Sequence, residues 1–217
     1  MKLLFGFSAI AQDVPSEGLK LADDIHETVD KVTVTVMLLS GKTYTGLMIV
    51  THYRPDGPGP FPIVIFNHGR STAMEKRAMP PRQRYTNVAR YWIRRGFAVF
   101  VPTRLGYGDS GLVPDPEYSG SSCENRNFSV PLTAILKEID AIADFAKTLP
   151  WADTKRLIVM GQSYGGFASI GATGQNRAGL IAAINFAGGG GGDRHARLGP
   201  PTEGDKLSSP GSWSRLD

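Results

Sequence analysis

The sequence predicts an α/β protein with a doubly wound, mostly parallel sheet that opens with an antiparallel hairpin. Short apolar runs rich in β-branched residues alternate with longer segments of helical periodicity as far as residue 187. A strictly alternating run precedes them, and a Gly-x-Ser-x-Gly turn follows the third buried strand. The 217 residues are enough for one domain with a sizeable core.

The opening hairpin is predicted at residues 31–39 and 43–53. Both segments are β-branched, the first one alternates, and Gly41 breaks the chain between them. Strands and helices then follow in turn, as a sheet covered on both faces requires. We expect buried strands beginning at Ile63 and at residues 97–102, 156–161 and 180–188, with helices at 82–95, 131–148 and 164–175.

The two ends of the chain differ in character from this core. Residues 1–11 carry one Lys, an apolar run and Ala-x-Ala, a pattern typical of a short secretory signal. This predicts a secreted or periplasmic protein. The alternatives are an ordinary apolar strand or a mis-assigned start codon, and the protein would then be cytoplasmic. Half of the thirty residues 188–217 are Gly, Pro or Ser and show no period. We therefore expect a domain at 12–187 that lacks its final strands, followed by an irregular tail.

Composition excludes several classes of partner. Hydrophobic residues make up 41% and charged residues 20%, as in ordinary globular proteins. The net charge of +4 comes from well-mixed side chains, so we expect no nucleic-acid partner. No run approaches the roughly eighteen apolar residues of a membrane span. The densest basic stretch is predicted to form the polar face of a helix; it comprises Arg82, Arg84, Arg90, Arg94 and Arg95.

The segment Gly161-Gln162-Ser163-Tyr164-Gly165 carries the clearest chemical signal. An apolar strand ends at Met160 and a helix begins just after Ser163. A strand–turn–helix junction of this kind exposes the serine hydroxyl above the sheet edge, which is the geometry of a nucleophile. Gly161 and Gly165 permit the tight turn and the close approach of helix to strand. The alternative is a Gly-rich corner without chemistry.

A nucleophilic serine needs two hydrogen-bond donors for the oxyanion of its tetrahedral intermediate. The backbone N–H of Tyr164, directly after Ser163, is one candidate. The loop after the strand that begins at Ile63 offers the second, the backbone N–H of Arg70. In that loop we interpret His68 as a loop-shaping residue beside Gly69, in preference to a general base.

Taken in order, these motifs resemble the α/β-hydrolase superfamily over residues 30–187. The strand-His-Gly loop and the segment "RLGYGDSG" are most similar to the dienelactone-hydrolase-like and prolyl-oligopeptidase-like branch. The resemblance implies that the latter segment lines the wall of the site, through Arg104, Gly106, Gly108 and Ser110. It also implies a second half-cystine for Cys123, the only cysteine, which could equally be a lone thiol.

The sequence departs from the family where the other triad residues belong. In that superfamily the acid and the histidine follow the serine on loops after later strands. Here the chain ends soon after the strand at 180–188, so we expect a C-terminally truncated or frame-shifted hydrolase. Asp193 and His195 are the remaining candidates for a triad with Ser163. Two residues this close on one loop seldom reach one serine in series.

These observations predict a serine hydrolase that cleaves an ester, a lactone or a similar acyl bond of a small molecule. The first alternative is a catalytically inactive fragment or binding module that keeps the cleft, and the second is a peptidase of the prolyl-oligopeptidase type. We expect no cofactor, and no metal because the histidines have no partners at ligand spacing. The insertion at residues 112–128 is a candidate lid. The sequence does not predict the oligomeric state.

Overall fold

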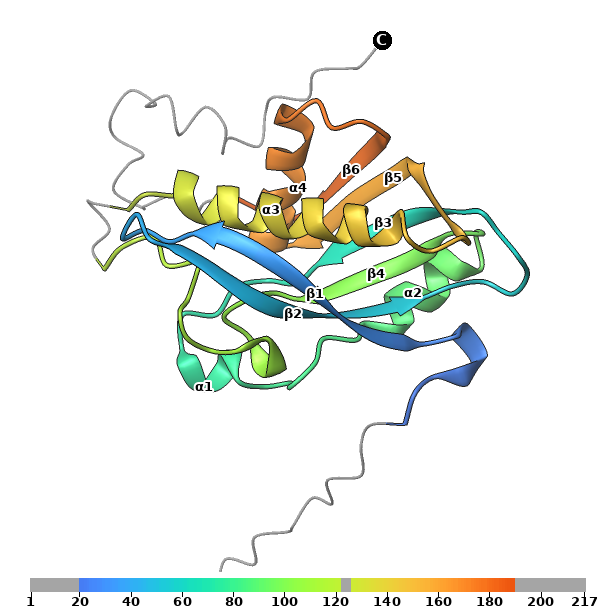
Figure 1. Ribbon diagram of the computed structural model, residues 1–217, viewed down its shortest axis with the longest axis horizontal. Helices are drawn as coiled ribbons and strands as arrows, with labels where there is room; N and C mark the ends of the chain where they lie inside the picture. Colours follow the sequence, from blue (N-terminus) through green and yellow to red (C-terminus); the bar gives the residue numbers. More distant parts are fainter. Residues whose placement is uncertain (1–19, 122–125, 190–217) are drawn as a thin grey trace, which may run out of the picture.

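The computed structural model describes residues 20–121 and 126–189, and these residues form one six-stranded sheet with helices on both faces (Figure 1). The strand order is β1-β2-β4-β3-β5-β6. The strands are β1 (Thr28–Met37), β2 (Thr43–Tyr53), β3 (Phe61–Asn67), β4 (Ala98–Thr103), β5 (Ala152–Gln162) and β6 (Leu180–Phe186). The helices are η1 (Asp23–Ile25), α1 (Met74–Arg77), α2 (Thr86–Ile93), η2 (Gly108–Ser110), α3 (Ser129–Ala146) and α4 (Tyr164–Gly174).

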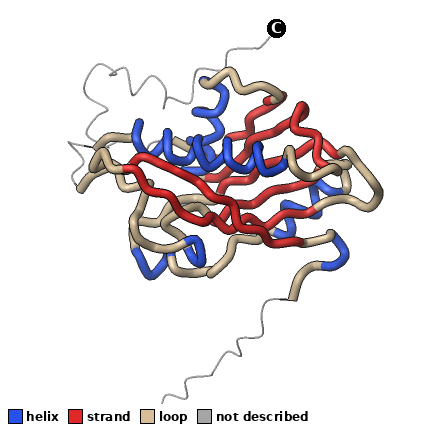
Figure 2. Tube along the Cα trace, viewed as in Figure 1, coloured by secondary structure: helices blue, strands red, loops and turns tan. Residues whose placement is uncertain are grey.

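The pairing confirms the predicted sheet. β1 and β2 form the antiparallel hairpin, which turns at Gly41 with a φ of 79°, and β2 pairs antiparallel with β4. The pairs β3–β4, β3–β5 and β5–β6 are all parallel. Figure 2 shows the strands as one twisted layer between the helices. The carboxyl ends of β3, β4 and β5 meet at one edge of the sheet, where doubly wound proteins bind their ligands.

Two separate cores hold the helices to the two faces of the sheet. Helices α3 and α4 pack on one face against buried side chains that include Val34, Ile65, Phe100, Ile139 and Val159. Helix α2 covers the other face, where the core includes Tyr53, Phe66, Ala89, Val101 and Met160. This two-sided burial explains why the central strands are continuous apolar runs in the sequence.

Helix α3 begins two residues earlier than its periodicity predicts. The side-chain oxygen of Asn127 accepts hydrogen bonds from the backbone N–H groups of Ser129 at 3.0 Å and Val130 at 3.3 Å. Asn127 therefore satisfies two of the N–H groups that a helix leaves open at its first turn. Ser129 and Val130 can then join the helix although they lie outside the apolar repeat.

The helix predicted at residues 82–95 is wrong at its start. Residues 82–85 are not helical, and α2 runs only from Thr86 to Ile93. The reason is electrostatic: Arg82 and Arg84 turn away from the helix and bind the carboxylate of Glu27, whose side chain is fully buried. Of the five arginines assigned to a helix face, only Arg90 lies in α2, where it pairs with Asp24. This basic stretch is therefore mainly an anchor for the segment before α2.

The Glu27 anchor should set the acid stability of the protein. Burial raises the pKa of the Glu27 carboxyl, but hydrogen bonds from Arg84 and Arg82 outweigh burial and lower it from 4.5 to about 2. The anion therefore contributes stability that is complete above pH 4.5 and is lost as the pH falls toward 2.

We expect Glu27→Gln to lower the free energy of unfolding at pH 7 by on the order of 3 kcal/mol, because it leaves two arginines without their buried partner. The variant should also lose less stability than the wild type between pH 4.5 and pH 2. Urea unfolding across that range measures both effects. Glu75→Gln, at an exposed position, is the matched control; equal losses in the two variants would contradict the role of the anchor.

Candidate active site

Ser163 stands at the sharp turn between β5 and α4. Its backbone has φ 55° and ψ −119°, a conformation that a non-glycine residue rarely adopts. The turn is fixed on both sides, because the Ser163 N–H donates to the carbonyl of Phe186 at 2.9 Å and the Ser163 carbonyl accepts from the N–H of Phe167 at 3.0 Å. The serine itself is exposed. Strained, exposed serines at the end of a parallel strand are typical of nucleophile turns.

Gly161 and Gly165 allow this turn to lie against the end of β3. A Cβ on Gly161 would come within 2.7 Å of the carbonyl oxygen of Asn67, and one on Gly165 would collide with the same oxygen. Side-chain atoms do not approach a backbone oxygen so closely, so both positions require glycine. The loop after β3 is equally close, since a Cβ on Gly69 would lie 3.4 Å from that of Ser163.

Two backbone N–H groups near Ser163 are free to bind an oxyanion. Tyr164 is the first residue of α4, and the first N–H groups of a helix have no partner within it. The N–H of Arg70 likewise donates to no acceptor among residues 20–121 and 126–189. Both N–H groups are therefore candidate donors for an oxyanion hole, and on that ground we call residues 68–71 the oxyanion loop.

His68 is buried, and both of its ring nitrogens are occupied. Nε2 accepts from the backbone N–H of Arg104 at 3.2 Å, so Nδ1 carries the proton and donates to the carbonyl of Gly69 at 2.7 Å. Burial and the neighbouring Arg104 charge hold the pKa of His68 well below its usual value. The neutral His68 ring therefore holds the loop in shape, and it has no free lone pair with which to act as a general base.

The side chain of Arg104 supports the same loop. Its guanidinium is fully buried and donates to the carbonyl of His68 at 2.6 Å and to that of Gly69 at 3.2 Å. Its charge is balanced by Glu117, which it contacts through Nε. The family resemblance implies that Arg104 lines the wall of the site. The side chain of Arg104 is instead fully buried and supports the oxyanion loop from inside the protein. A buried charge-assisted network of this kind is rigid when every member is paired.

Glu117 belongs to the segment that the sequence predicts as a lid. The side chain of Arg70 pairs with Glu117 at 3.3 Å and with Asp115 at 3.2 Å. Arg77 also pairs with Asp115, at 3.4 Å. Pro116, Glu117 and Ser119 are buried. Residues 112–121, the part of the insertion that holds these contacts, are therefore packed against the oxyanion loop.

Sequence reasoning did not identify this acidic pair, because neither carboxylate belongs to a recognisable sequence motif. Asp115 and Glu117 lie in a Pro-rich loop, where acidic residues are usually solvated. The one available signal was the count of arginines around the loop: Arg70, Arg77 and Arg104 all need counter-charges if they are buried. That signal becomes specific only once the fold brings the three arginines together.

The other described histidines lie away from Ser163. His26 contacts Asp56 at 2.6 Å on the surface. His52 contacts Asp30 at 2.7 Å, and its ring lies among the rings of Phe100, Phe145 and Trp151. Within the described ranges no histidine contacts Ser163, and no three His, Cys, Asp or Glu side chains gather as a metal site would need. Asp193, His195, Cys123 and residues 1–11 lie outside the described ranges.

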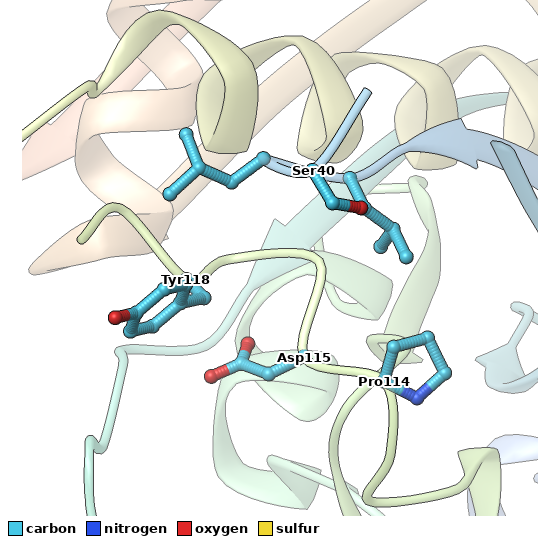
Figure 3. Close-up of a pocket in the computed structure, with 6 residues that line it drawn as sticks. Ser40, Pro114, Asp115 and Tyr118 are labelled. Atoms are coloured by element: carbon cyan, nitrogen blue, oxygen red, sulfur yellow. The ribbon is translucent and has the colours of Figure 1, made fainter. Parts of the chain in front are cut away.

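Two hollows lie near the loops of this sheet edge. A hollow of about 220 Å³ is bordered by the oxyanion loop and by Gln162, the neighbour of Ser163. A larger one, of about 540 Å³, lies between the β1–β2 turn and the insertion; Figure 3 shows Ser40 on one side of it and Pro114, Asp115 and Tyr118 on the other. Only the smaller hollow touches the residues around the nucleophile turn, so it is the candidate substrate pocket.

Comparison with known proteins identifies the fold. No protein-family model and no curated protein sequence matches the chain. Among solved structures it is similar to a protein described as a dienelactone hydrolase from Klebsiella pneumoniae, with 20% identity, a TM-score of 0.50, and coverage of 77% of this chain and 62% of that one. It is also similar to dipeptidyl peptidase 4 of Porphyromonas gingivalis, with 16% identity and a TM-score of 0.50 over 73% of this chain and 20% of that one.

The chain has the α/β-hydrolase fold. It spans about three fifths of the length of the first of these structures. Both of these structures carry the names of hydrolytic enzymes, a dienelactone hydrolase and a dipeptidyl peptidase. No helix of the described residues has the length and apolarity needed to cross a membrane.

The close packing at Gly165 can be tested by adding a methyl group. We expect Gly165→Ala to lower the free energy of unfolding by about 1–3 kcal/mol, because the Cβ meets the backbone of β3. Gly174→Ala, at the other end of the same helix, has open space around its Cβ and should be neutral or slightly stabilising. Urea unfolding of the two variants decides; equal effects would show that the turn does not need glycine.

A second carboxyl in this region should make stability fall at high pH. Glu138 of α3 is buried and accepts the N–H of Leu105 at 2.9 Å. Burial raises its pKa from 4.5 to about 8, despite the neighbouring Arg104. The folded state thus holds a proton that the unfolded state releases, so the contribution of Glu138 to the free energy of unfolding should fall between pH 4.5 and pH 8.

We expect Glu138→Gln to remove this fall, since the amide keeps the acceptor for Leu105 and cannot ionise. The variant should match the wild type near pH 5 and be the more stable protein near pH 9. Thermal or urea unfolding over this range measures the difference. Asp144→Asn, exposed on the same helix, should follow the wild type; a stability difference between Glu138→Gln and the wild type that does not change with pH would contradict the prediction.

Proposed function

We propose that the chain is a serine hydrolase that cleaves an ester, a lactone or a similar acyl bond, with Ser163 as the nucleophile. The observation that carries this proposal is the backbone of Ser163, strained and exposed at the carboxyl end of β5. Strain of this kind persists where the surroundings impose it and where function uses it. No other described serine has a positive φ.

In the proposed reaction the oxygen of Ser163 attacks the substrate carbonyl, a base takes the hydroxyl proton and passes it to the leaving oxygen, and a tetrahedral intermediate forms between the two transfers. The N–H groups of Tyr164 and Arg70 stabilise its oxyanion, and the alcohol leaves when the carbon–oxygen bond breaks. Water then hydrolyses the acyl-enzyme and regenerates the serine. Arg104 and His68 act as positioning residues, because they bind the carbonyls of His68 and Gly69, the two residues directly before the Arg70 N–H.

One observation favours the rival class, a binding module without turnover. The serine needs a base, and none of the described histidines contacts it. His195 and Asp193 are the candidates for that role, and they lie outside the described residues. A binding module would keep the pocket and the oxyanion donors and would show binding without acylation. A prolyl-oligopeptidase-type peptidase is the second alternative, and it needs the same acylation of Ser163.

Covalent labelling separates these functions. We expect an activated fluorophosphonate to label the full-length protein at Ser163, with the modified peptide identified by mass spectrometry. Ser163→Ala should abolish the labelling, whereas Ser40→Ala, at another exposed serine, should leave it unchanged. Hydrolysis of short p-nitrophenyl esters should disappear with the same variant. A wild-type protein that is folded but unlabelled would favour the binding module and refute the hydrolase.

A further inference from the structure

Tyr85, the residue that immediately precedes α2, has a left-handed backbone with φ 48° and ψ 44°. A bulky residue seldom adopts this conformation, because its Cβ approaches the following carbonyl. Asn or Gly would relieve the strain at such a position. A tyrosine kept there calls for a reason that lies in its side chain.

Several hydrogen bonds force the strained conformation on the chain. The Tyr53 hydroxyl donates to the carbonyl of Arg84 at 2.6 Å. The N–H of Gln83 donates to the Thr103 hydroxyl, and the Thr51 hydroxyl donates to the carbonyl of Gln83, both at 2.8 Å. With Arg82 and Arg84 held by Glu27, the three residues before Tyr85 cannot relax.

The ring of Tyr85 is fixed and its hydroxyl is free. The ring packs against Phe66, with centroids 4.6 Å apart. The hydroxyl bonds to no other part of the described chain, and it is not among the fully buried polar atoms, so solvent or a ligand can reach it. Burial of the ring raises the pKa of Tyr85, so the hydroxyl keeps its proton at neutral pH and can donate it in a hydrogen bond.

Tyr85 lines the 220 Å³ pocket beside Ser163, in which every lining residue except Gly69 has a polar side chain. Several of these polar groups are already engaged within the protein: His68 with its own loop, Tyr107 with Glu117, and Arg70 with two carboxylates. The remaining lining residues with a donor are Ser71, Lys76, Gln83, Tyr85 and Gln162. The charge of Arg70 is balanced by two carboxylates, whereas Lys76 has no ion pair within residues 20–121 and 126–189. A small pocket lined by donors suits a short group that carries an oxygen acceptor.

We propose that Tyr85 is a substrate-binding residue and that the pocket selects acyl groups with an oxygen substituent, such as a hydroxyl, next to the carbonyl. The position follows from the lining residues. Gly69 and Gln162 line the pocket and adjoin Ser163, so the part of the acyl group next to the carbonyl is the part that would enter it. This inference rests on the proposed function for the placement of that carbonyl.

The test uses equilibrium binding and therefore needs no turnover. Lactate and propionate, two product acids that differ only in the hydroxyl, are titrated into the full-length protein by calorimetry or NMR. Wild type should bind lactate about threefold to tenfold more tightly than propionate, the range of one neutral hydrogen bond. Tyr85→Phe keeps the ring and should erase most of the preference. Tyr91→Phe, at an exposed tyrosine of α2, should retain it.

Equal affinities in the wild type, a preference that survives Tyr85→Phe, or no binding of either acid would each overturn the inference. A thermal unfolding curve shows whether Tyr85→Phe is folded, and Tyr85→Leu with unchanged selectivity would also count against the proposal. Labelling of Ser163 is measured separately. If Ser163 is labelled and lactate is not preferred, the hydrolase stands and the pocket assignment fails. If lactate is preferred through Tyr85 and Ser163 is not labelled, the pocket stands and the nucleophile fails.

Discussion

The candidate site depends on one buried charge, the guanidinium of Arg104. It binds the carbonyls of His68 and Gly69 on one side and Glu117 on the other, and its own backbone N–H binds the His68 ring. A buried cation is tolerated only when its donors are paired, so the oxyanion loop and the insertion must both be in place for the network to be stable. The loop after β3, the loop after β4 and the insertion therefore form one structural unit.

The sheet and the serine turn could be predicted because their signals are local. Buried parallel strands are apolar throughout, and the glycines on both sides of Ser163 report a close approach that no other residue permits. Helix α2 shows the limit of that reasoning. Its first predicted turn, from Arg82 to Tyr85, is helical by pattern, but Glu27 binds the two arginines and draws the segment out of the helix.

The chemistry around Ser163 was less accessible from sequence than the fold. A Gly-x-Ser-x-Gly turn is recognised from five consecutive residues. The oxyanion loop beside it is supported by Arg104 and Glu117, and the fold is needed to show that these two side chains form an ion pair. Tyr85 gives no signal in the sequence, since neither its left-handed backbone nor its free hydroxyl follows from the residue type. Such contacts depend on tertiary structure, and local propensity does not determine them.

The anchor at Glu27 joins parts of the chain that are far apart in sequence, because Arg82 and Arg84 follow it by 55 and 57 residues. The same segment ends at Tyr85, so the orientation of the Tyr85 ring depends on the Glu27 carboxylate, directly before the N-terminal hairpin. Under the proposed role of Tyr85, a substitution at Glu27 would redirect the tyrosine and alter ligand preference, although Glu27 does not line the pocket.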